Sequence, residues 1–331
     1  MLISWNTTKK CNLHCRHCYR DSGPEADTRA ELNTAQGKTL LDQIKGAGFK
    51  LIIFSGGEPL LRPDIFELAA HAVKTGLRPV LGSNGTLITA AVAARLVEAG
   101  VSGIAISLDS VAAEYHDRFR GCDGAWAQAV QGIENSLAAG LRVQVNTTLT
   151  ENNGDQFSAL VDYATGLGVQ ALHPFFLVPA GRGKNLAAES LQREKYFQMI
   201  ATVLEKQRET AIELKPTCAP QFLPMAKEMG LPMRFTRGCL AGVAYGCIVP
   251  NGDLHLCPYL PVKAGNVLEK PFDEIWRDSE ILQALRDYQK YEGRCGQCDA
   301  IDLCGGCRAR AYYYHNGNYL AEEPWCYRSE R

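Results

Sequence analysis

The chain has 331 residues, of which 46% are hydrophobic and 21% charged, and its formal net charge at pH 7 is −1. This length and composition predict a globular protein with a sizeable core and about two domains. The balanced charge gives no basis for binding nucleic acid or an anionic membrane. Because "MLISWNTTKK" lacks an apolar signal core and no run approaches the roughly 20 apolar residues of a membrane span, we expect a cytoplasmic protein without nucleic-acid or membrane partners.

Strands and helices are predicted to alternate along the first half of the chain. β-rich runs occupy residues 2–8, 50–59, 78–85, 102–109, 142–149 and 169–178. Helical periodicity ending in glycine occupies residues 34–48, 64–76, 88–100, 125–140 and 154–168. Six β–α units in series predict an α/β fold whose parallel sheet closes, or nearly closes, into a partial (β/α)6 TIM barrel. Functional groups are then expected at the carboxyl ends of the strands.

The thirteen cysteines are unevenly placed and gather toward the two ends of the chain. In a reducing compartment such cysteines are metal ligands or catalytic groups rather than disulfides. Cys11, Cys15 and Cys18 follow the first predicted strand with the spacing C-x3-C-x2-C. Three thiolates on a 4Fe–4S cluster leave one iron open to a ligand that the protein does not supply.

This triplet resembles that of the radical S-adenosylmethionine (SAM) superfamily, with His17 where many members have an aromatic residue. The resemblance covers residues 1 to about 180, because further motifs follow the next strands in the expected order. It implies that SAM completes the cluster and that the reduced cluster cleaves SAM to a 5′-deoxyadenosyl radical. The SAM-binding residues that it implies are Gly56, Gly57, Glu58 and Pro59 in "SGGEP", Ser83 and Asn84 in "GSNG", Ser107 and Asp109 in "ISLDS", Arg120, and Asn146.

Each of these motifs also has a plainer interpretation. Paired glycines let a backbone approach a ligand closely, but they also form simple turns at strand ends. Asn84–Gly85 is likewise a common turn sequence. Arg120 offers a two-pronged donor for the SAM carboxylate. Its neighbour Arg118 is the competing candidate, or else a solvated charge at a helix end.

The C-terminal third resembles the SPASM extension of radical SAM enzymes, which carries auxiliary iron–sulfur clusters. The run from Cys295 to Cys307 has the spacing C-x2-C-x5-C-x2-C, too tight for a zinc ribbon, whose cysteine pairs lie about 15–20 residues apart. The resemblance implies a second auxiliary 4Fe–4S cluster on Cys295, Cys298, Cys304 and Cys326. It implies a first auxiliary cluster on Cys239, Cys257 and Cys307, with Cys247 as the fourth ligand. Peptide-modifying relatives have a final gap of three residues, so the number of auxiliary clusters, one or two, stays open.

Three regions are predicted: a radical SAM core barrel over residues 1–184, a bridging helical region over 185–234 and a SPASM domain over 235–331. Asn251–Gly252 is predicted to turn a hairpin, and Trp276 to pack in the core. Cys122 is interpreted as an incidental loop thiol. Cys218 is interpreted as a buried structural thiol, with a cluster ligand or a contact to a metal-containing substrate as alternatives.

"IELKPTCAPQF", "RFTRGCLAG" and "CGGCRARAYYYHNGNYLAEEPWC" resemble the haem-pathway branch of the SPASM enzymes. That resemblance implies a siroheme-derived iron tetrapyrrole as substrate and a low-potential electron donor such as ferredoxin or flavodoxin. The most specific prediction is removal of two acetates from didecarboxysiroheme to give iron-coproporphyrin. Propionate removal toward haem d1, or propionate decarboxylation to vinyl, would use the same machinery.

A flat polyanion needs cations and aromatic surface. The candidates for this role are Arg182, Lys215, Arg237, Arg308, Arg310 and the run Tyr312–Tyr314. Two other functions compete with the haem prediction. A peptide maturase forming a crosslink is disfavoured because the barrel begins at residue 2, with no leader-binding domain before it. An iron–sulfur electron carrier would have no use for the SAM-binding motifs.

Overall fold

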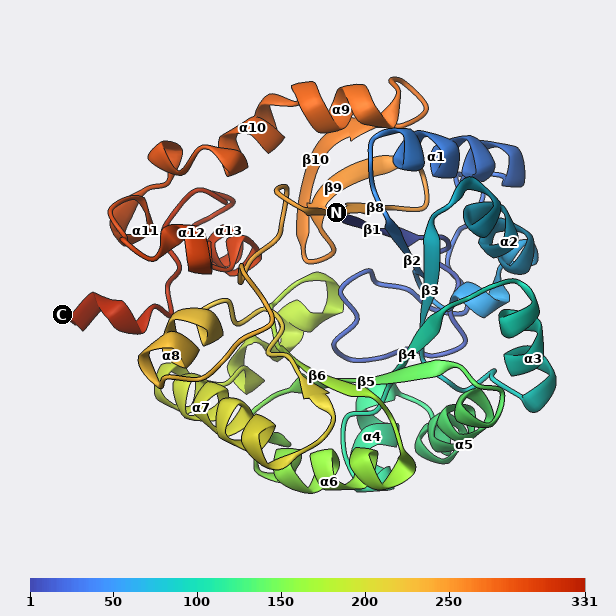
Figure 1. Cartoon of the computed structure of the whole chain (residues 1–331), viewed down its shortest axis with the longest axis horizontal. Helices are drawn as coiled ribbons and strands as arrows, with labels where there is room; N and C mark the ends of the chain where they lie inside the picture. Colours follow the sequence, from blue (N-terminus) through green and yellow to red (C-terminus); the bar gives the residue numbers. More distant parts are fainter. Residues whose placement is uncertain (331) are drawn as a thin grey trace.

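Ten strands form one sheet in the computed structural model, which describes residues 1–330 (Figure 1). Their order is β10-β9-β8-β1-β2-β3-β4-β5-β6-β7. The pairs from β8–β1 through β6–β7 are parallel, whereas β8–β9 and β9–β10 are antiparallel. Within the described residues β7 and β10 are the two edges, so the barrel is partial, as predicted.

The strands are β1 (Leu2–Asn6), β2 (Leu51–Ser55), β3 (Arg78–Ser83), β4 (Gly103–Ser107), β5 (Arg142–Leu149), β6 (Ala171–Phe176), β7 (Glu213–Leu214), β8 (Tyr245–Ile248), β9 (Asp253–Cys257) and β10 (Leu260–Asn266). The α-helices are α1 (Thr34–Gly46), α2 (Ile65–Thr75), α3 (Ala90–Glu98), α4 (Ala113–Arg120), α5 (Ala125–Ala138), α6 (Phe157–Leu167), α7 (Arg193–Glu209), α8 (Phe222–Glu228), α9 (Phe272–Asp278), α10 (Glu280–Arg286), α11 (Gly293–Gly296), α12 (Ile301–Cys304) and α13 (Arg308–Tyr314). No helix in this part of the chain has the length and apolar character needed to cross a bilayer.

Each of the six predicted strands and five predicted helices of the barrel is present, with ends displaced by a few residues. Two barrel elements were not predicted. Helix α4 is short and mostly polar, so few apolar side chains mark its buried face in the sequence. Strand β7 has only two residues, and its pairing with β6 is a contact that local sequence cannot reveal.

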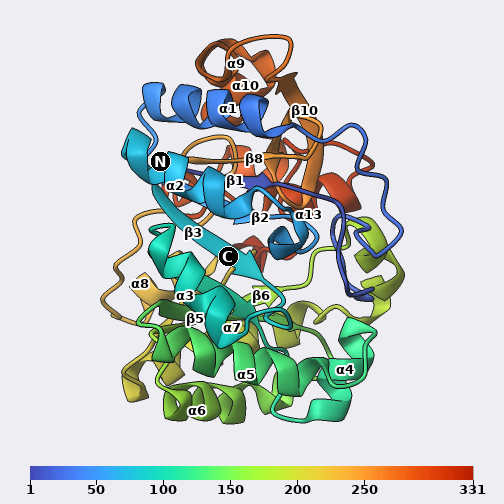
Figure 2. The ribbon, with the colours of Figure 1, turned by 90° about the vertical axis from the view of Figure 1, so that its right-hand side faces the viewer.

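The three predicted regions share the sheet. Strand β7 of the bridging region extends it at one edge, and the β8–β10 strands of the SPASM region extend it at the other. The predicted hairpin is present, with β8 and β9 antiparallel and Gly252 at a φ of 88° in the turn between them. Figure 2 shows α9 beside α1, and the Phe272 backbone N–H donates to Gln43 Oε1 of α1 at 3.0 Å. The proposed domain boundaries stay a prediction.

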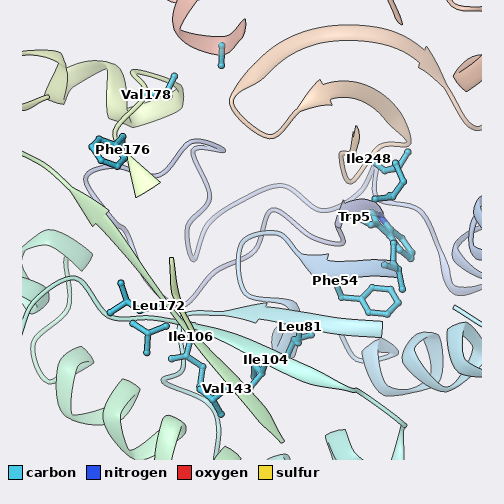
Figure 3. Packing of buried hydrophobic residues seen from close by; sticks show 14 of the residues in the cluster. Trp5, Phe54, Leu81, Ile104, Ile106, Val143, Leu172, Phe176, Val178 and Ile248 are labelled. Carbon is cyan, nitrogen blue, oxygen red and sulfur yellow. The ribbon is translucent and has the colours of Figure 1, made fainter. Parts of the chain in front are cut away.

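One face of the strands packs on the surrounding helices and forms the hydrophobic core. Trp5, Phe54, Leu81, Ile104 and Val143 are buried there, and Figure 3 shows them on successive strands. Trp276 is 8% exposed and packs against Phe49 and Phe272, which confirms its predicted place in the core.

The opposite, inner face of the barrel is polar and accessible. Burial alternates along β5 and β6 and along β4 from Ile104 onward, so that every second residue stays partly exposed although the strands lie inside a ring of helices (Figure 1). The parallel register places Ser107 beside Asn146 and Asn146 beside His173 on this face. A filled barrel interior carries bulky branched side chains. This polar lining therefore suits a bound polar ligand.

The two glycines of "SGGEP" fit against the backbone that leads to the cysteine triplet. The Gly57 N–H donates to the Thr8 carbonyl at 2.7 Å, and the Glu58 N–H donates to the Lys10 carbonyl at 2.8 Å. A Cβ at Gly57 would lie 2.1 Å from the Lys10 carbonyl oxygen, a distance that no atom pair tolerates. Gly56 adopts a φ of 145°, which strains any other residue.

Gly57→Ala is expected to destabilise the protein by about 2 kcal/mol or more, because the clash is with backbone rather than with a flexible side chain. Gly46→Ala is the matched control, since a Cβ at this helical position meets nothing within 4 Å. That control should be neutral or stabilising by up to about 1 kcal/mol. Anaerobic denaturant unfolding of both variants measures the difference. Equal stabilities would contradict this packing.

Candidate active site

The cysteine triplet lies in the loop after β1, which crosses the middle of the ring in Figure 1. Cys11, Cys15 and Cys18 pack with Leu13 and with Cys122, which places the thiol interpreted as incidental beside the triplet. The Cys11 sulfur accepts a hydrogen bond from the Leu13 N–H at 3.4 Å, and the Cys18 sulfur accepts one from the Ser22 N–H at 3.4 Å. These sulfur atoms are held by the backbone of their own loop.

The triplet suits a metal cluster. Burial raises the pKa of Cys11 to about 12 and also raises the pKa of Cys15. The free thiols therefore stay protonated, and cluster binding must displace their protons. Backbone N–H groups already point at the sulfur atoms and favour the thiolate that a cluster needs.

Glu58 connects the second and third strand-end motifs. Both of its carboxylate oxygens accept from Ser83 Oγ at 3.0 Å, and the Asn84 N–H donates to it at 2.9 Å. Burial raises the pKa of Glu58 to about 7. Asn84 Nδ2 in turn lies 3.8 Å from the Cys11 sulfur. Glu58 and Ser83 therefore orient the loop that carries Asn84, and Asn84 is the member of this network that reaches the triplet.

Asp109 and Arg120 form a buried ion pair next to the triplet. Arg120 Nε donates to Asp109 Oδ2 at 2.6 Å, and the Thr148 N–H donates to Asp109 Oδ1 at 2.9 Å. Burial opposes ionisation of Asp109, but the charge and hydrogen bond of Arg120, together with His17 and His116, outweigh burial and lower the pKa of Asp109 to about 2. Arg120 Nη1 lies 4.0 Å from the Cys15 sulfur.

The structure distinguishes the predicted SAM-binding residues that face the triplet from those that only position their neighbours. Arg120 faces the triplet, whereas Arg118 is exposed and lies over the Tyr115 ring at 6.0 Å. The carboxylate of Asp109 is taken up by protein groups, so it positions Arg120 instead of facing a ligand itself. Ser107 and Asn146 lie side by side on the inner face of the barrel, and Gln144 Nε2 donates to Asn146 Oδ1 at 2.6 Å. Pro59 begins a short 3-10 helix after Glu58.

The four cysteines assigned to the second auxiliary cluster line one cavity of about 370 Å³. They are Cys295, Cys298, Cys304 and Cys326. Within residues 1–330, no three Cys, His, Asp or Glu side chains close around a point suited to one metal ion. The cavity is much larger than the roughly 30 Å³ that one water occupies. It therefore has room for a polynuclear cluster. The Cys295 sulfur accepts from the Glu323 N–H at 3.3 Å and from Arg308 Nη2 at 3.5 Å.

Cys218, interpreted from the sequence as a structural thiol with a cluster ligand as an alternative, lies beside the first auxiliary set. The Cys218 thiol lies close to the Cys307 sulfur and lowers the pKa of Cys307. Burial raises the pKa of Cys257, and negative charge on the nearby Cys239 and Cys307 sulfur atoms raises it further. Cys218 has a φ of 61°, uncommon for a residue with a side chain, and its carbonyl accepts from Arg310 Nη2 at 2.8 Å.

Cys247, the predicted fourth ligand, makes different contacts. It lies on β8 opposite His255 of β9. Its sulfur is 3.3 Å from Asn6 Oδ1 and accepts from Arg20 Nη2 at 3.1 Å. The only sign of Cys218 in the sequence is an otherwise unexplained cysteine in "KPTCAPQF". Cys218 and Cys307 are 89 residues apart (307 minus 218), so only the folded structure shows that they are close.

The prediction that Arg308 and Arg310 bind the tetrapyrrole is wrong. Arg308 and Arg310 are 1% and 0% exposed, because their guanidinium groups are used inside the SPASM region. Arg308 donates to the Ala321 carbonyl at 2.7 Å, and Arg310 pairs with Glu323 at 3.2 Å.

Of the other predicted tetrapyrrole-binding residues, two arginines bind cysteine carbonyl groups, whereas a lysine and a tyrosine are at least partly exposed. Arg182 holds the triplet loop by donating to the Cys15 carbonyl at 2.9 Å, and Arg237 donates to the Cys239 carbonyl at 2.8 Å. Lys215 is partly exposed, with its Nζ 4.5 Å from the Phe235 ring centroid. Tyr314 is 40% exposed.

We propose Cys218 as the fourth ligand of the first auxiliary cluster, so Cys218→Ala is expected to lose about four iron atoms per chain from an anaerobically reconstituted total of about twelve. Cys247→Ala is the matched control and should keep its full iron content. Iron analysis and the low-temperature electron paramagnetic resonance spectrum of the reduced protein measure both. Loss of iron from Cys247→Ala with full iron in Cys218→Ala would restore the sequence-based assignment.

Comparisons with known proteins agree with this arrangement. Residues 5–164 match the radical SAM superfamily, and residues 239–299 match the SPASM iron–sulfur cluster-binding domain. An "AdoMet-dependent heme synthase" of Oleidesulfovibrio alaskensis is 41% identical, over 98% of this chain and 86% of that protein. An "Fe-coproporphyrin III synthase" of Methanosarcina barkeri is 33% identical, over 98% of this chain and 87% of that protein.

The fold also has a solved counterpart. The structure of Streptococcus suis SuiB bound to S-adenosylmethionine superposes with a TM-score of 0.77 at 18% identity, covering 98% of this chain and 77% of SuiB. At that identity the likeness concerns the fold alone. The triplet with its SAM-side motifs, the C-terminal cysteine sets and the end-to-end relatives lead to one conclusion: the chain belongs to the radical SAM superfamily, among its enzymes with a SPASM iron–sulfur domain.

Proposed function

We propose that this radical SAM enzyme processes the carboxylate side chains of an iron tetrapyrrole in haem formation. The observation that carries the proposal is the 41% identity with a protein named AdoMet-dependent heme synthase over 98% of the chain, which takes in both cysteine-rich ends. The polar inner face of the barrel supports it, since a ligand with several carboxylates needs polar partners rather than an apolar core.

The residues near the triplet would have different roles in binding the cluster and SAM. Cys11, Cys15 and Cys18 would hold the cluster, and the bound cluster with SAM supplies the 5′-deoxyadenosyl radical. Arg120 would bind the SAM carboxylate, because its guanidinium lies beside the triplet in a fixed orientation. Asp109 holds that orientation from behind.

The most specific sequence prediction was removal of two acetates to give iron-coproporphyrin. The relative named Fe-coproporphyrin III synthase is 33% identical, against 41% for the relative named heme synthase. This difference favours the haem-forming step. We therefore take iron-coproporphyrin as the substrate and decarboxylation of propionate to vinyl as the reaction, with acetate removal from didecarboxysiroheme as the second candidate. A low-potential protein such as ferredoxin or flavodoxin would reduce the SAM-binding cluster.

Anaerobic incubation of the enzyme with SAM, dithionite and iron-coproporphyrin should give successive losses of carbon dioxide with two hydrogen atoms per side chain. One hydrogen atom passes to the 5′-deoxyadenosyl radical, the other leaves as the carboxyl proton, and the remaining electron passes to an acceptor such as an oxidised iron–sulfur cluster. Formation of 5′-deoxyadenosine should accompany each loss, and mass spectrometry measures both. A variant with Cys11, Cys15 and Cys18 replaced by Ala should form neither product while keeping its C-terminal iron.

A parallel incubation with didecarboxysiroheme separates the two candidate reactions. Acetate loss there, with iron-coproporphyrin unchanged, would move the enzyme to the earlier step. If neither tetrapyrrole is converted or raises the rate of SAM cleavage, while a cysteine-bearing peptide does, the tetrapyrrole proposal is wrong.

A further inference from the structure

Arg20 links the triplet loop to the SPASM hairpin. It lies two residues after Cys18, and its Nε donates to Asn6 Oδ1 at the carboxyl end of β1 at 2.7 Å. Its Nη2 donates to the Cys247 sulfur on β8 at 3.1 Å. Its Nη1 lies 3.4 Å from His255 Nδ1 on β9. One guanidinium thus touches three strands and stands between the two metal-bearing parts of the chain.

This guanidinium has donors to spare and lacks an anionic partner. Three of the five N–H donors of an arginine are used in the contacts above, which leaves two. Among the side chains of residues 1–328 Arg20 forms no ion pair with a carboxylate, whereas Arg120 and Arg310 pair with Asp109 and Glu323. A largely enclosed cation without a counterion is unfavourable unless an anion is supplied from elsewhere.

The surroundings of Arg20 are partly exposed and aromatic. The alternation along β9 places His255 on the same face as Cys257, and both stay partly exposed. The rings of Tyr19 and Tyr259 lie 4.9 Å apart, and Arg20 lies 5.5 Å from the Tyr19 ring centroid. Flat rings beside a cation form a surface suited to an aromatic anion.

We propose that Arg20 binds one carboxylate of the substrate through its two remaining N–H donors, with Tyr19 and Tyr259 against the ring system. This inference rests on the proposed function and names the residue that fixes which side chain faces the triplet. A bidentate guanidinium–carboxylate pair sets both distance and orientation. Since Arg20 is part of the triplet loop, an anchored carboxylate would hold the macrocycle at a fixed distance from the SAM site.

Arg308 illustrates the competing role for such a charge. Among the described side chains it also pairs with no carboxylate, and it donates to the Cys295 sulfur of the second auxiliary set. If Arg20 acted in the same way, it would balance thiolate or cluster charge near Cys247 and Cys257 and would have no direct effect on substrate. The two roles predict different responses to the charge of the substrate.

The test measures binding of iron-coproporphyrin and of its tetramethyl ester to the reconstituted enzyme by absorbance titration, without turnover. Arg20→Gln should weaken binding of the acid by about thirtyfold or more. Binding of the ester by Arg20→Gln should stay within about twofold of wild type, because the ester has no carboxylate for Arg20 to bind. Arg142→Gln, at an exposed position at the start of β5, is the matched control and should bind both ligands as wild type does.

Arg20→Lys keeps the charge and loses the two-pronged geometry, so it should weaken binding of the acid by a smaller factor than Arg20→Gln. It also serves as the readout if Arg20→Gln does not fold. Equal binding of the acid by wild type and both variants would overturn the inference and leave the proposed function intact. An equal loss for acid and ester, or a changed auxiliary-cluster resonance with unchanged binding, would assign Arg20 to the cluster instead. If the wild type binds neither tetrapyrrole, the proposed function itself fails.

Discussion

Strand β1 is hydrogen-bonded on both sides in parallel, to β2 of the barrel and to β8 of the SPASM region, and the site depends on this pairing. Ser4 is in register with Ile53 on one side and with Cys247 on the other. The loop that follows β1 carries the triplet, and the strand antiparallel to β8 leads to Cys257. Two cysteine-rich segments more than 200 residues apart are thereby fixed side by side, because β1 is buried and a slipped register would move its side chains out of the core.

Backbone contacts and buried charges then shape the SAM side of the barrel. The "SGGEP" turn binds the peptide groups of Thr8 and Lys10, so the first and second strand ends are held as one unit. Glu58 ties the third strand end to this unit, and Asp109 ties helix α4 to the fourth through Arg120. Each motif is held mainly by its neighbours, which explains why single motifs in the sequence looked like ordinary turns.

The sequence predicted what local patterns determine. Strand alternation and helix periodicity gave the barrel elements, and the order of the strand-end motifs placed Asn84 and Arg120 near the triplet. Patterns could not show that Cys218 approaches Cys307, since this contact depends on how the bridging region packs on α13. They also could not show that Arg308 and Arg310 point inward, because the sequence around an arginine does not show which groups it will contact in the folded protein. Arg20 escaped notice for the same reason, since its partners lie on strands far along the chain.

The central claim is that a radical formed at the triplet removes hydrogen from a tetrapyrrole side chain held against the inner face of the barrel. Close placement makes such a step effectively unimolecular. The most direct measurement uses iron-coproporphyrin carrying deuterium on the propionate carbons next to the ring, with mass spectrometry of the 5′-deoxyadenosine formed. The account predicts one deuterium in each 5′-deoxyadenosine molecule that accompanies a converted side chain. Vinyl product accompanied by unlabelled 5′-deoxyadenosine would contradict it.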